Sequence, residues 1–292
     1  MKTIAKLLSN SFLCEKARKL WQCNKRDWNY PLSKWQKLMV GLYLIVRDYA
    51  EGNFPPCYDD EQATFNSEIA YSRTLQTLGV PEDEFELVDM RKPFWHGPKS
   101  RKYLRDYVDI VSFFHNCGIT PPARLLEVGC GSGWVAEFLA SSGFRVCATT
   151  LDATAGEKIE LRKKSLEAKG LPTDLQFRPS PMEYVHDAVE DLPPFDVVYV
   201  YEALHHAHNW RRAISAFYDC VGTEGWCFIL SEPNVLHTLI SYRVGRLSNT
   251  HEIGLSQLEL RNELKQVGFQ RIKAWKSRFH WWTKPIWIAA QK

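Results

Sequence analysis

The stretch Leu125-Leu126-Glu127-Val128-Gly129-Cys130-Gly131-Ser132-Gly133 decides the fold. Its first four residues form a mainly apolar run typical of a buried strand, and three glycines at alternate positions follow directly. Because glycine adopts backbone conformations that other residues avoid, such a turn lets the main chain approach a ligand closely, with N–H groups of the next helix pointing at it. The stretch therefore predicts a strand, a ligand-binding turn and the start of a helix.

An acidic residue stands at a suitable distance beyond this turn. Asp152 follows Gly133 by nineteen positions, at the end of the next apolar run. A carboxylate at that point can accept hydrogen bonds from both hydroxyls of a ribose. The alternative, a turn that serves only strand-to-helix packing, does not account for the acidic residue. We therefore interpret the pair of signals as a nucleoside-binding site.

From Pro121 onward, short apolar runs alternate with amphipathic segments, as parallel βαβ units require. The apolar runs are Arg124–Val128, Arg145–Leu151, Leu175–Arg178, Phe195–Tyr201, Trp226–Ser231, Phe269–Lys276 and Pro285–Gln291. Helix-like segments are Trp134–Ser142, Thr154–Lys169, Trp210–Val221 and Ser256–Val267. The last two runs are joined by about eight residues, which implies an antiparallel hairpin. The sequence predicts an α/β protein with a Rossmann-like, doubly wound, seven-stranded sheet whose last strand is antiparallel.

The part before this core is predicted to be helical. Apolar residues recur at helical spacing over Lys34–Tyr49, with Ser33 as the N-cap, and a weaker helix is expected over Glu61–Leu78. A polar stretch with Pro and Gly, residues 91–98, precedes a helix over about Lys99–Cys117 and is interpreted as a hinge or lid. We expect residues 1–118 to form a helical region that covers the site and residues 119–292 to form the catalytic core.

Composition excludes several classes of protein. The formal net charge is +3 with charges well mixed, which differs from the basic stripe of nucleic-acid-binding proteins. The longest uncharged apolar run near the start, Leu38–Val46, is far shorter than the roughly 20 residues of a membrane span. The first residues lack the continuous apolar segment of a signal peptide, and the 8 cysteines contain no CxxC pair. We expect a cytoplasmic protein with reduced thiols, no nucleic-acid partner and no membrane span.

The core resembles the class I S-adenosylmethionine (SAM) methyltransferases over residues 121–292. Their motif Glu/Asp-x-Gly-x-Gly-x-Gly is matched by Glu127, Gly129, Gly131 and Gly133. The apolar strand that ends in Leu204-His205-His206 resembles the family's fourth strand and its following loop. Three later segments also match, namely Gly222-Thr223-Glu224-Gly225-Trp226, Leu264-Lys265-Gln266-Val267-Gly268-Phe269 and Trp287-Ile288-Ala289-Ala290.

This resemblance implies SAM as the cofactor and S-adenosylhomocysteine as its product. It assigns the methionine portion to the glycine turn, the ribose to Asp152 and the adenine to residues after the third strand. At the adenine position the family often has an Asp, whereas Ser180-Pro181 stands here, so Ser180 or Glu183 would be the polar partner. The implied cofactor-binding residues are Glu127, Gly129, Cys130, Gly131, Gly133, Asp152, Pro181, Met182, Glu183, Tyr201 and Tyr103.

A sulfonium methyl group is already activated, so the protein must hold an acceptor atom in line and, for a hydroxyl, remove its proton. The candidate bases at the end of the fourth strand are His206 first, then His205, then Glu202. Alternatively, one histidine packs against the helix start and the other binds backbone. These side chains with His208 match no zinc signature, and we expect no metal.

The acceptor is expected to be a small molecule or glycan, methylated on a hydroxyl oxygen. Aromatic and basic residues outside the glycine motif are the candidates for binding it, since aromatic surfaces suit rings, sugars and lipids. The same tryptophans would equally serve as the covering layer of an edge hairpin or as a homodimer surface. The candidate substrate-binding residues are Trp95, His96, Arg243, Trp281 and Trp282.

Two other functions compete with methyl transfer. A catalytically silent SAM-binding module would keep Asp152 and the glycines but would not depend on the histidines. A nicotinamide-dependent oxidoreductase is disfavoured because the third glycine comes one residue too early for Gly-x-Gly-x-x-Gly and because the last strand is predicted to be antiparallel. Competition between cofactors separates these alternatives.

Overall fold

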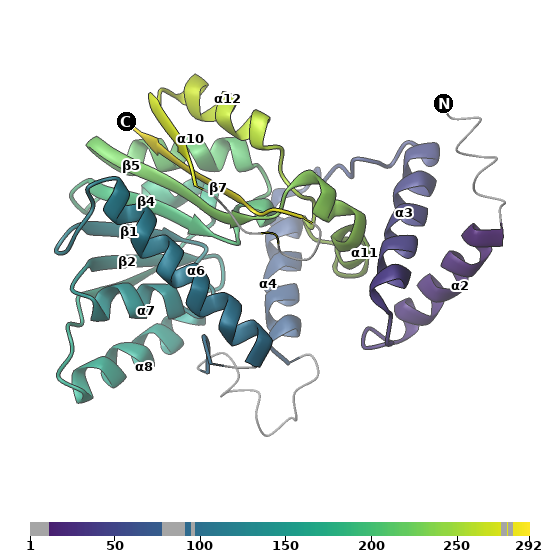
Figure 1. Ribbon diagram of the computed structural model, residues 1–292, viewed down its shortest axis with the longest axis horizontal. Helices are drawn as coiled ribbons and strands as arrows, with labels where there is room; N and C mark the ends of the chain where they lie inside the picture. Colours follow the sequence, from purple (N-terminus) through teal and green to yellow (C-terminus); the bar gives the residue numbers. More distant parts are fainter. Residues whose placement is uncertain (1–11, 78–90, 95–96, 276–278, 280–282) are drawn as a thin grey trace.

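A mixed sheet forms the centre of the molecule (Figure 1). The computed structural model describes residues 12–77, 91–94, 97–275, 279 and 283–292. Within them the seven strands lie in the order β3-β2-β1-β4-β5-β7-β6. Strands β1 to β5 are parallel, and β7 is antiparallel to both β5 and β6. The predicted fold class is confirmed. The strands are β1 Arg124–Val128, β2 Arg145–Thr150, β3 Leu175–Pro179, β4 Phe195–Tyr201, β5 Val221–Glu232, β6 Arg271–Ala274 and β7 Ile286–Gln291.

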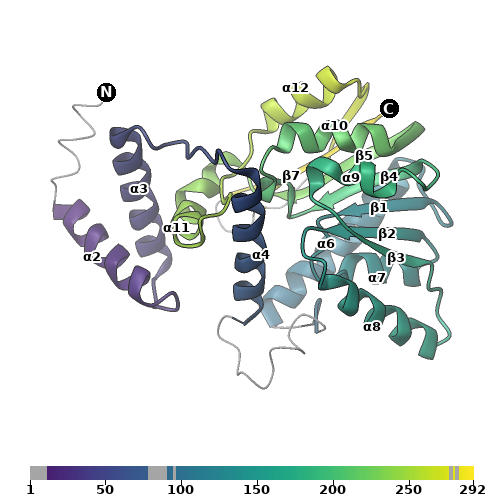
Figure 2. The same ribbon diagram turned by 180° about the vertical axis from the view of Figure 1, so that it is seen from behind.

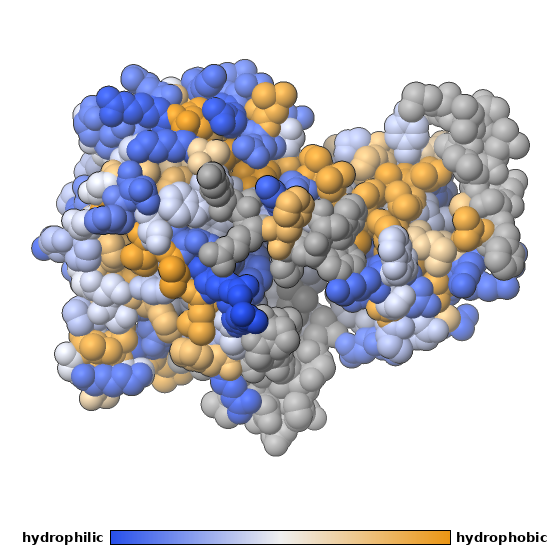
Figure 3. Space-filling model, in the orientation of Figure 1, coloured by the Kyte–Doolittle hydropathy of each residue, from blue (hydrophilic) through white to orange (hydrophobic). Residues whose placement is uncertain are grey.

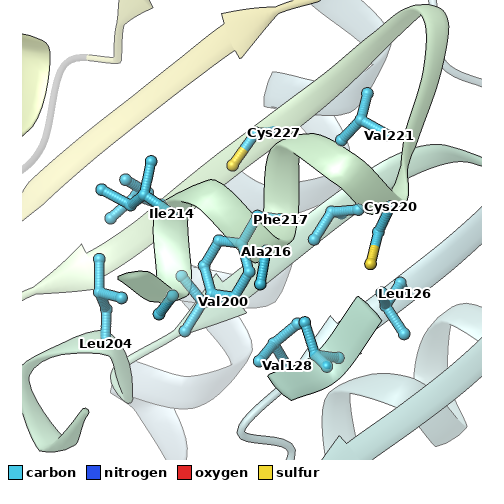
Figure 4. Close-up of a cluster of buried hydrophobic side chains, with 14 of the residues drawn as sticks. Leu126, Val128, Val200, Leu204, Ile214, Ala216, Phe217, Cys220, Val221 and Cys227 are labelled. Carbon is cyan, nitrogen blue, oxygen red and sulfur yellow. The ribbon is translucent and has the colours of Figure 1, made fainter. Parts of the chain in front are cut away.

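Helices cover both faces of this sheet, which explains why the central strands read as almost continuous apolar runs. One face carries α6 Gly97–Asn116, α7 Trp134–Ser141 and α8 Ala155–Ala168. The other face carries α9 Val185–Val189, α10 Trp210–Cys220 and α12 Gln257–Val267. Figure 4 shows part of this second core, in which Ile214 and Phe217 of α10 lie beside Val200 of β4 and Val128 of β1.

Helix α6 packs directly onto the sheet. Its residues Ile110, Phe113 and Phe114 are buried, and the Phe113 ring lies edge-on to the Phe228 ring of β5 at 5.1 Å between centroids. The helix therefore shares a core with the strands although it precedes residue 118, where the two predicted regions meet.

The segments before α6 form a separate layer (Figures 1 and 2). Helices α2 Phe12–Arg26 and α3 Lys34–Glu51 form a hairpin that packs on α11 Thr238–Ser248. Ser33 caps α3 as predicted, because its side chain accepts from the Gln36 N–H while Gln36 binds the Ser33 N–H. The sequence did not indicate α11 within the long connection after β5. Tyr242 of α11 is buried against the α2–α3 hairpin, so the apolar face of α11 packs on residues that are far away in the sequence.

Helix α4 Glu61–Thr77 stands between the α2–α3 hairpin and the sheet (Figure 2). It lies across the edge where the parallel strands end, next to the switch point between β1 and β4. In open α/β sheets, ligands bind at this edge. Among the described residues no helix is long and apolar enough to cross a membrane.

Candidate functional site

The glycine turn after β1 has the backbone that its sequence predicts. Gly129, Gly131 and Gly133 all have positive φ, of 73°, 54° and 72°. A Cβ on Gly129 would lie 2.7 Å from the Ala203 Cβ and 2.8 Å from the Met182 Cε, whereas a Cβ on Gly131 would meet nothing within 4 Å. Residue 129 is thus glycine because of close packing, and Gly131 leaves its main chain open to a ligand.

A cavity of about 210 Å³ opens from this turn. It continues along the end of β2 to Asp152 and along the loop after β3, and α4 closes its outer side. Acidic side chains from four segments face it, a suitable surrounding for a cofactor with a cationic sulfur. The open glycine turn, the carboxylate beyond β2 and this charge together fit SAM. The lining includes Phe65, Glu68, Ile69, Tyr71, Ser72, Gly129, Gly131, Thr150, Leu151, Asp152, Ser180, Pro181, Met182, Glu183, Glu202, Ala203, His206, Ala207 and His208.

Asp152 lines the cavity as predicted, yet both of its oxygens are already engaged. Arg73 of α4 donates from Nε to Oδ2 at 2.9 Å and from a terminal nitrogen to Oδ1 at 3.0 Å. Thr154 donates its N–H and its hydroxyl to Oδ1 at 3.0 and 2.8 Å. These bonds, that of Arg73 foremost, lower the pKa of Asp152 to about 2. The carboxylate is therefore ionised. Arg73 occupies both of the oxygens that were expected to accept hydrogen bonds from ribose hydroxyls.

The sequence did not indicate that α4 would be a wall of this cavity. Glu68 is its main link to the core, since it accepts the His251 N–H at 2.8 Å and lies 3.0 Å from the Nδ1 of His206. Tyr71 donates to Glu252 at 2.7 Å. Because the apolar spacing of this helix is weak, only its links to distant segments reveal its position.

Glu232, the last residue of β5, organises the loop after β4. Its buried carboxylate accepts the N–H groups of Ala203 and Leu204 at 2.7 and 2.9 Å, and that of His205 at 3.2 Å. It also lies 2.8 Å from the Nδ1 of His205. A carboxylate at this position makes Nδ1 the protonated nitrogen of the imidazole, which leaves Nε2 free to accept a proton.

His206 stands in a different electrostatic environment. Burial alone would lower its pKa, but the nearby carboxylate of Glu68, with the further charges of Glu252 and Glu232, raises the pKa to about 9. Its Nε2 is 3.9 Å from a Glu252 oxygen. The ring therefore carries a proton at neutral pH in this arrangement and attaches α4 to the core, whereas a base must be unprotonated.

Glu202, the third candidate base, belongs to a charged network at the ends of β4 and β5. It lies 2.6 Å from the Nζ of Lys102, which also lies 2.7 Å from Asp106. Burial opposes the charge of Lys102, but these two carboxylates raise its pKa. Tyr201 donates to Asp106 at 2.6 Å. Glu202 has a φ of 50°, in the left-handed region that non-glycine residues avoid.

A second cavity, of about 230 Å³, adjoins the first. The two share Glu202 and His206 in their walls, so these side chains lie at the boundary between the cavities. Exposed apolar side chains, Val235 and Leu236, follow Pro233 on the chain near its rim. Its lining is Lys102, Glu202, His205, His206, Ser231, Pro233, His237, Thr283 and Pro285.

Several predicted cofactor residues support the site from outside the cavity. Glu127 is buried below the glycine turn, where burial raises its pKa to about 8. Cys130 is a buried thiol. The Tyr103 ring lies 5.5 Å from the Trp134 ring and does not line either cavity. Glu183 lines the cofactor cavity but accepts the Asn209 N–H at 2.8 Å, which caps α10.

Of the predicted substrate residues, Arg243 is described, and it lines neither of these two cavities. Arg243 of α11 is buried and donates to Asn24 of α2, so it joins two helices of the N-terminal layer. Trp95, His96, Trp281 and Trp282 lie outside the described residues.

One group of side chains in the described part of the chain has the composition of a metal site. Single ligand atoms of His205, His206 and Glu252 lie within 4.8 Å of one another. The sequence could not indicate Glu252 because it follows α11, far from the two histidines.

Comparisons with known proteins agree with this geometry. A family model described as a methyltransferase domain matches residues 100–274. The ubiquinone biosynthesis O-methyltransferase of Caulobacter vibrioides is 28% identical over 121 residues, which are 41% of this chain and 45% of that protein. The chain thus aligns with less than half the length of this curated relative.

Solved structures share the fold at low sequence identity. Magnesium protoporphyrin IX methyltransferase from Synechocystis PCC 6803 with bound SAH has a TM-score of 0.52 and 15% identity, over 80% of this chain and 97% of that chain. An O-methyltransferase family protein from Burkholderia thailandensis has a TM-score of 0.53 and 13% identity, over 88% and 71% of the two chains.

The fold and the glycine turn are those of the class I, SAM-dependent methyltransferases. With more than half of its residues matched by the family model, this chain belongs to the methyltransferase-domain family.

Proposed function

We propose that this protein transfers the methyl group of SAM to a hydroxyl oxygen of a small-molecule or glycan acceptor. The observation that carries the proposal is the junction of two cavities at Glu202 and His206, one with the features of a SAM site and one lined by His205. The named activity of the Caulobacter vibrioides relative, an O-methyltransferase, supports oxygen as the acceptor atom. None of the 8 cysteines is in a disulfide, which suits the reducing cytoplasm expected from the sequence.

The residues of the first cavity would hold the cofactor. Gly131 exposes backbone to its methionine portion, Asp152 accepts from the ribose hydroxyls, and Pro181 with Met182 borders the adenine. SAM supplies, when bound, a methyl group on a positively charged sulfur. The protein then has to align the acceptor oxygen, exclude water and remove a proton.

His205 is the best-supported base of the three candidates. Glu232 fixes its Nδ1, and the side chain lines the acceptor cavity, so Nε2 can take the proton of an acceptor hydroxyl. His206 keeps α4 in place through Glu68, and Glu202 is positioned by Lys102 at the boundary between the cavities. Both would act on substrate placement, whereas His205 acts on the reacting oxygen.

Helices α2, α3 and α4 would form the cap of the site. Of these, α4 lines the cofactor cavity through Phe65, Glu68 and Tyr71. The cap region predicted over residues 1–118 thus acts through α4, while α6 supports the sheet.

Transfer of a radiolabelled methyl group from SAM to a panel of hydroxyl and amino acceptors tests the proposal. For an accepted hydroxyl compound, His205→Gln should lower turnover by roughly 100-fold or more while SAM affinity is retained. His186→Gln, at a half-exposed site on α9, is the matched control. If no acceptor is methylated although SAM binds, the chain is a silent SAM-binding module. Equal turnover in His205→Gln and wild type would remove His205 as the base.

A further inference from the structure

Helix α3 buries one apolar face inside the N-terminal layer. Val40 and Leu44 are fully buried and pack with Trp21 of α2 and Tyr242 of α11. Gly41 contacts the backbone of Leu239 so closely that a Cβ would overlap the carbonyl oxygen of that residue. This face accounts for the stability of the hairpin.

The opposite face of α3 is also apolar, but it is open to solvent. Trp35, Leu42 and Tyr49 are spaced by seven residues, which is close to two helical turns, so they form one stripe along the helix. Their exposed fractions are 79%, 43% and 41%. Leu38, three residues after Trp35, is half-buried beside the stripe. A row of large apolar side chains exposed along one helix face marks an interaction surface, so this stripe predicts a partner.

Hydrophobic residues are visible on the lobe that carries α3 (Figure 3). The sheet domain at the other end of the molecule shows a larger share of polar surface in the same view. Helix α3, which carries the stripe, lies at the end of the molecule away from the sheet (Figure 1).

The α2–α3 hairpin that carries this stripe is positively charged. Residues 12–51 contain eight basic and four acidic side chains, so the hairpin alone has a formal charge of +4, whereas the whole chain has +3. One of the acids, Asp48, is buried between Arg47 and Arg246 and contributes no exposed negative charge. Lys34 and Lys37 are exposed on the first turn of α3.

We propose that the α2–α3 hairpin docks on the surface of an anionic lipid bilayer. Tryptophan, tyrosine and leucine suit the boundary between headgroups and acyl chains, and lysines with long apolar stems reach the lipid phosphates. A second copy of this chain is a poorer occupant, because two stripes in contact would bring two hairpins of charge +4 together. The bilayer supplies the opposite charge, and binding of this kind needs no membrane span.

Vesicle co-sedimentation of the full chain tests the proposal. Phosphatidylcholine vesicles with phosphatidylglycerol should bind the protein, and vesicles of phosphatidylcholine alone should bind it far less. High salt should release the protein, because screening removes the attraction between lysines and lipid phosphates.

Substitutions in the stripe provide the decisive test in the vesicle-binding experiment. The double variant Trp35→Ser, Leu42→Ser should lose about tenfold or more in partitioning to anionic vesicles. Leu258→Ser, at a residue of α12 that is 69% exposed, is the matched control and should bind like wild type. A thermal melt verifies that both variants are folded, and Lys34→Gln with Lys37→Gln tests the charges without touching the stripe.

Two results would overturn the proposal. One is wild-type protein that does not co-sediment with anionic vesicles. The other is a wild-type dimer, measured by sedimentation velocity, that dissociates in the Trp35→Ser, Leu42→Ser variant, which would assign the stripe to a second copy. Neither result depends on methyl transfer, so this test is independent of the proposed function.

Discussion

Removal of the Arg73 side chain should strengthen SAM binding. In the structure, Arg73 donates two hydrogen bonds to the carboxylate of Asp152, with N to O distances of 2.9 and 3.0 Å. In the proposed mode of binding, the ribose hydroxyls of SAM take the same two oxygens. Cofactor entry must therefore break this ion pair and move the part of α4 that holds it, and Arg73→Ala removes that cost.

The magnitude follows from the exposure of the pair. The Arg73 side chain is 56% exposed and that of Asp152 is 16% exposed, so the two charges interact largely through water. Such pairs stabilise by about 0.5 to 1 kcal/mol, even when two hydrogen bonds are formed. The dissociation constant of SAM should accordingly fall by roughly two- to fivefold in Arg73→Ala. Because the pKa of Asp152 is about 2, the carboxylate is charged throughout the neutral range and the effect should not vary with pH there.

Isothermal titration of SAM into wild type and Arg73→Ala, at low and at high salt, measures this effect. High salt should reduce the difference in SAM affinity between wild type and Arg73→Ala, since screening weakens the ion pair in wild type. Arg211→Ala, which breaks the exposed ion pairs of α10 with Glu259 and Glu263 of α12, is the control and should bind SAM like wild type. Weaker SAM binding in Arg73→Ala would refute the reasoning, because it would mean that Arg73 helps to hold the cofactor.

Three further predictions concern the turn, the histidine pair and metal. Gly131→Ala should weaken SAM binding at least tenfold, as isothermal titration would show. The free energy of unfolding should fall by only about 1 kcal/mol, because the new Cβ meets no atom and only the positive φ is unfavourable for alanine. Urea unfolding measures this second effect. The pKa of His206 rises in the folded state from 6.5 to about 9, so the stability that it contributes is complete below pH 6.5 and is lost as pH rises through 9. In Glu68→Gln this loss between pH 6.5 and 9 should shrink, as urea unfolding at both pH values would show, and an unchanged loss would contradict the assignment. Chelation by EDTA should leave turnover unchanged, whereas loss of turnover restored by a divalent ion would assign a metal to His205, His206 and Glu252.

The sequence predicted the sheet and the glycine site because their signals are local. The strand before Gly129, the three glycines and Asp152 lie within one βαβ unit, where backbone conformation and burial follow from short segments. The antiparallel end of the sheet was predictable for the same reason, since the short connection between β6 and β7 leaves no room for a crossover.

The remainder of the site depends on contacts between distant segments. Glu68, Arg73 and Glu252 have no motif around them, and their roles arise only when α4 and the segment after α11 meet the end of β4. The order of the candidate bases illustrates how contacts between distant segments change a prediction made from local sequence. Sequence places His206 first, whereas we propose His205, because Glu232 holds its Nδ1 while Glu68 and Glu252 raise the pKa of His206 to about 9.

Binding of SAM to the glycine site is the central claim, and isothermal titration of wild type and Asp152→Ala with SAM, SAH, NAD and NADP tests it most directly. SAM and SAH should bind wild type, neither nicotinamide cofactor should bind, and Asp152→Ala should weaken SAM binding by roughly 10- to 100-fold through loss of charge-assisted hydrogen bonds to the ribose. Binding of NAD in preference to SAM, or equal SAM affinity in Asp152→Ala and wild type, would contradict the account.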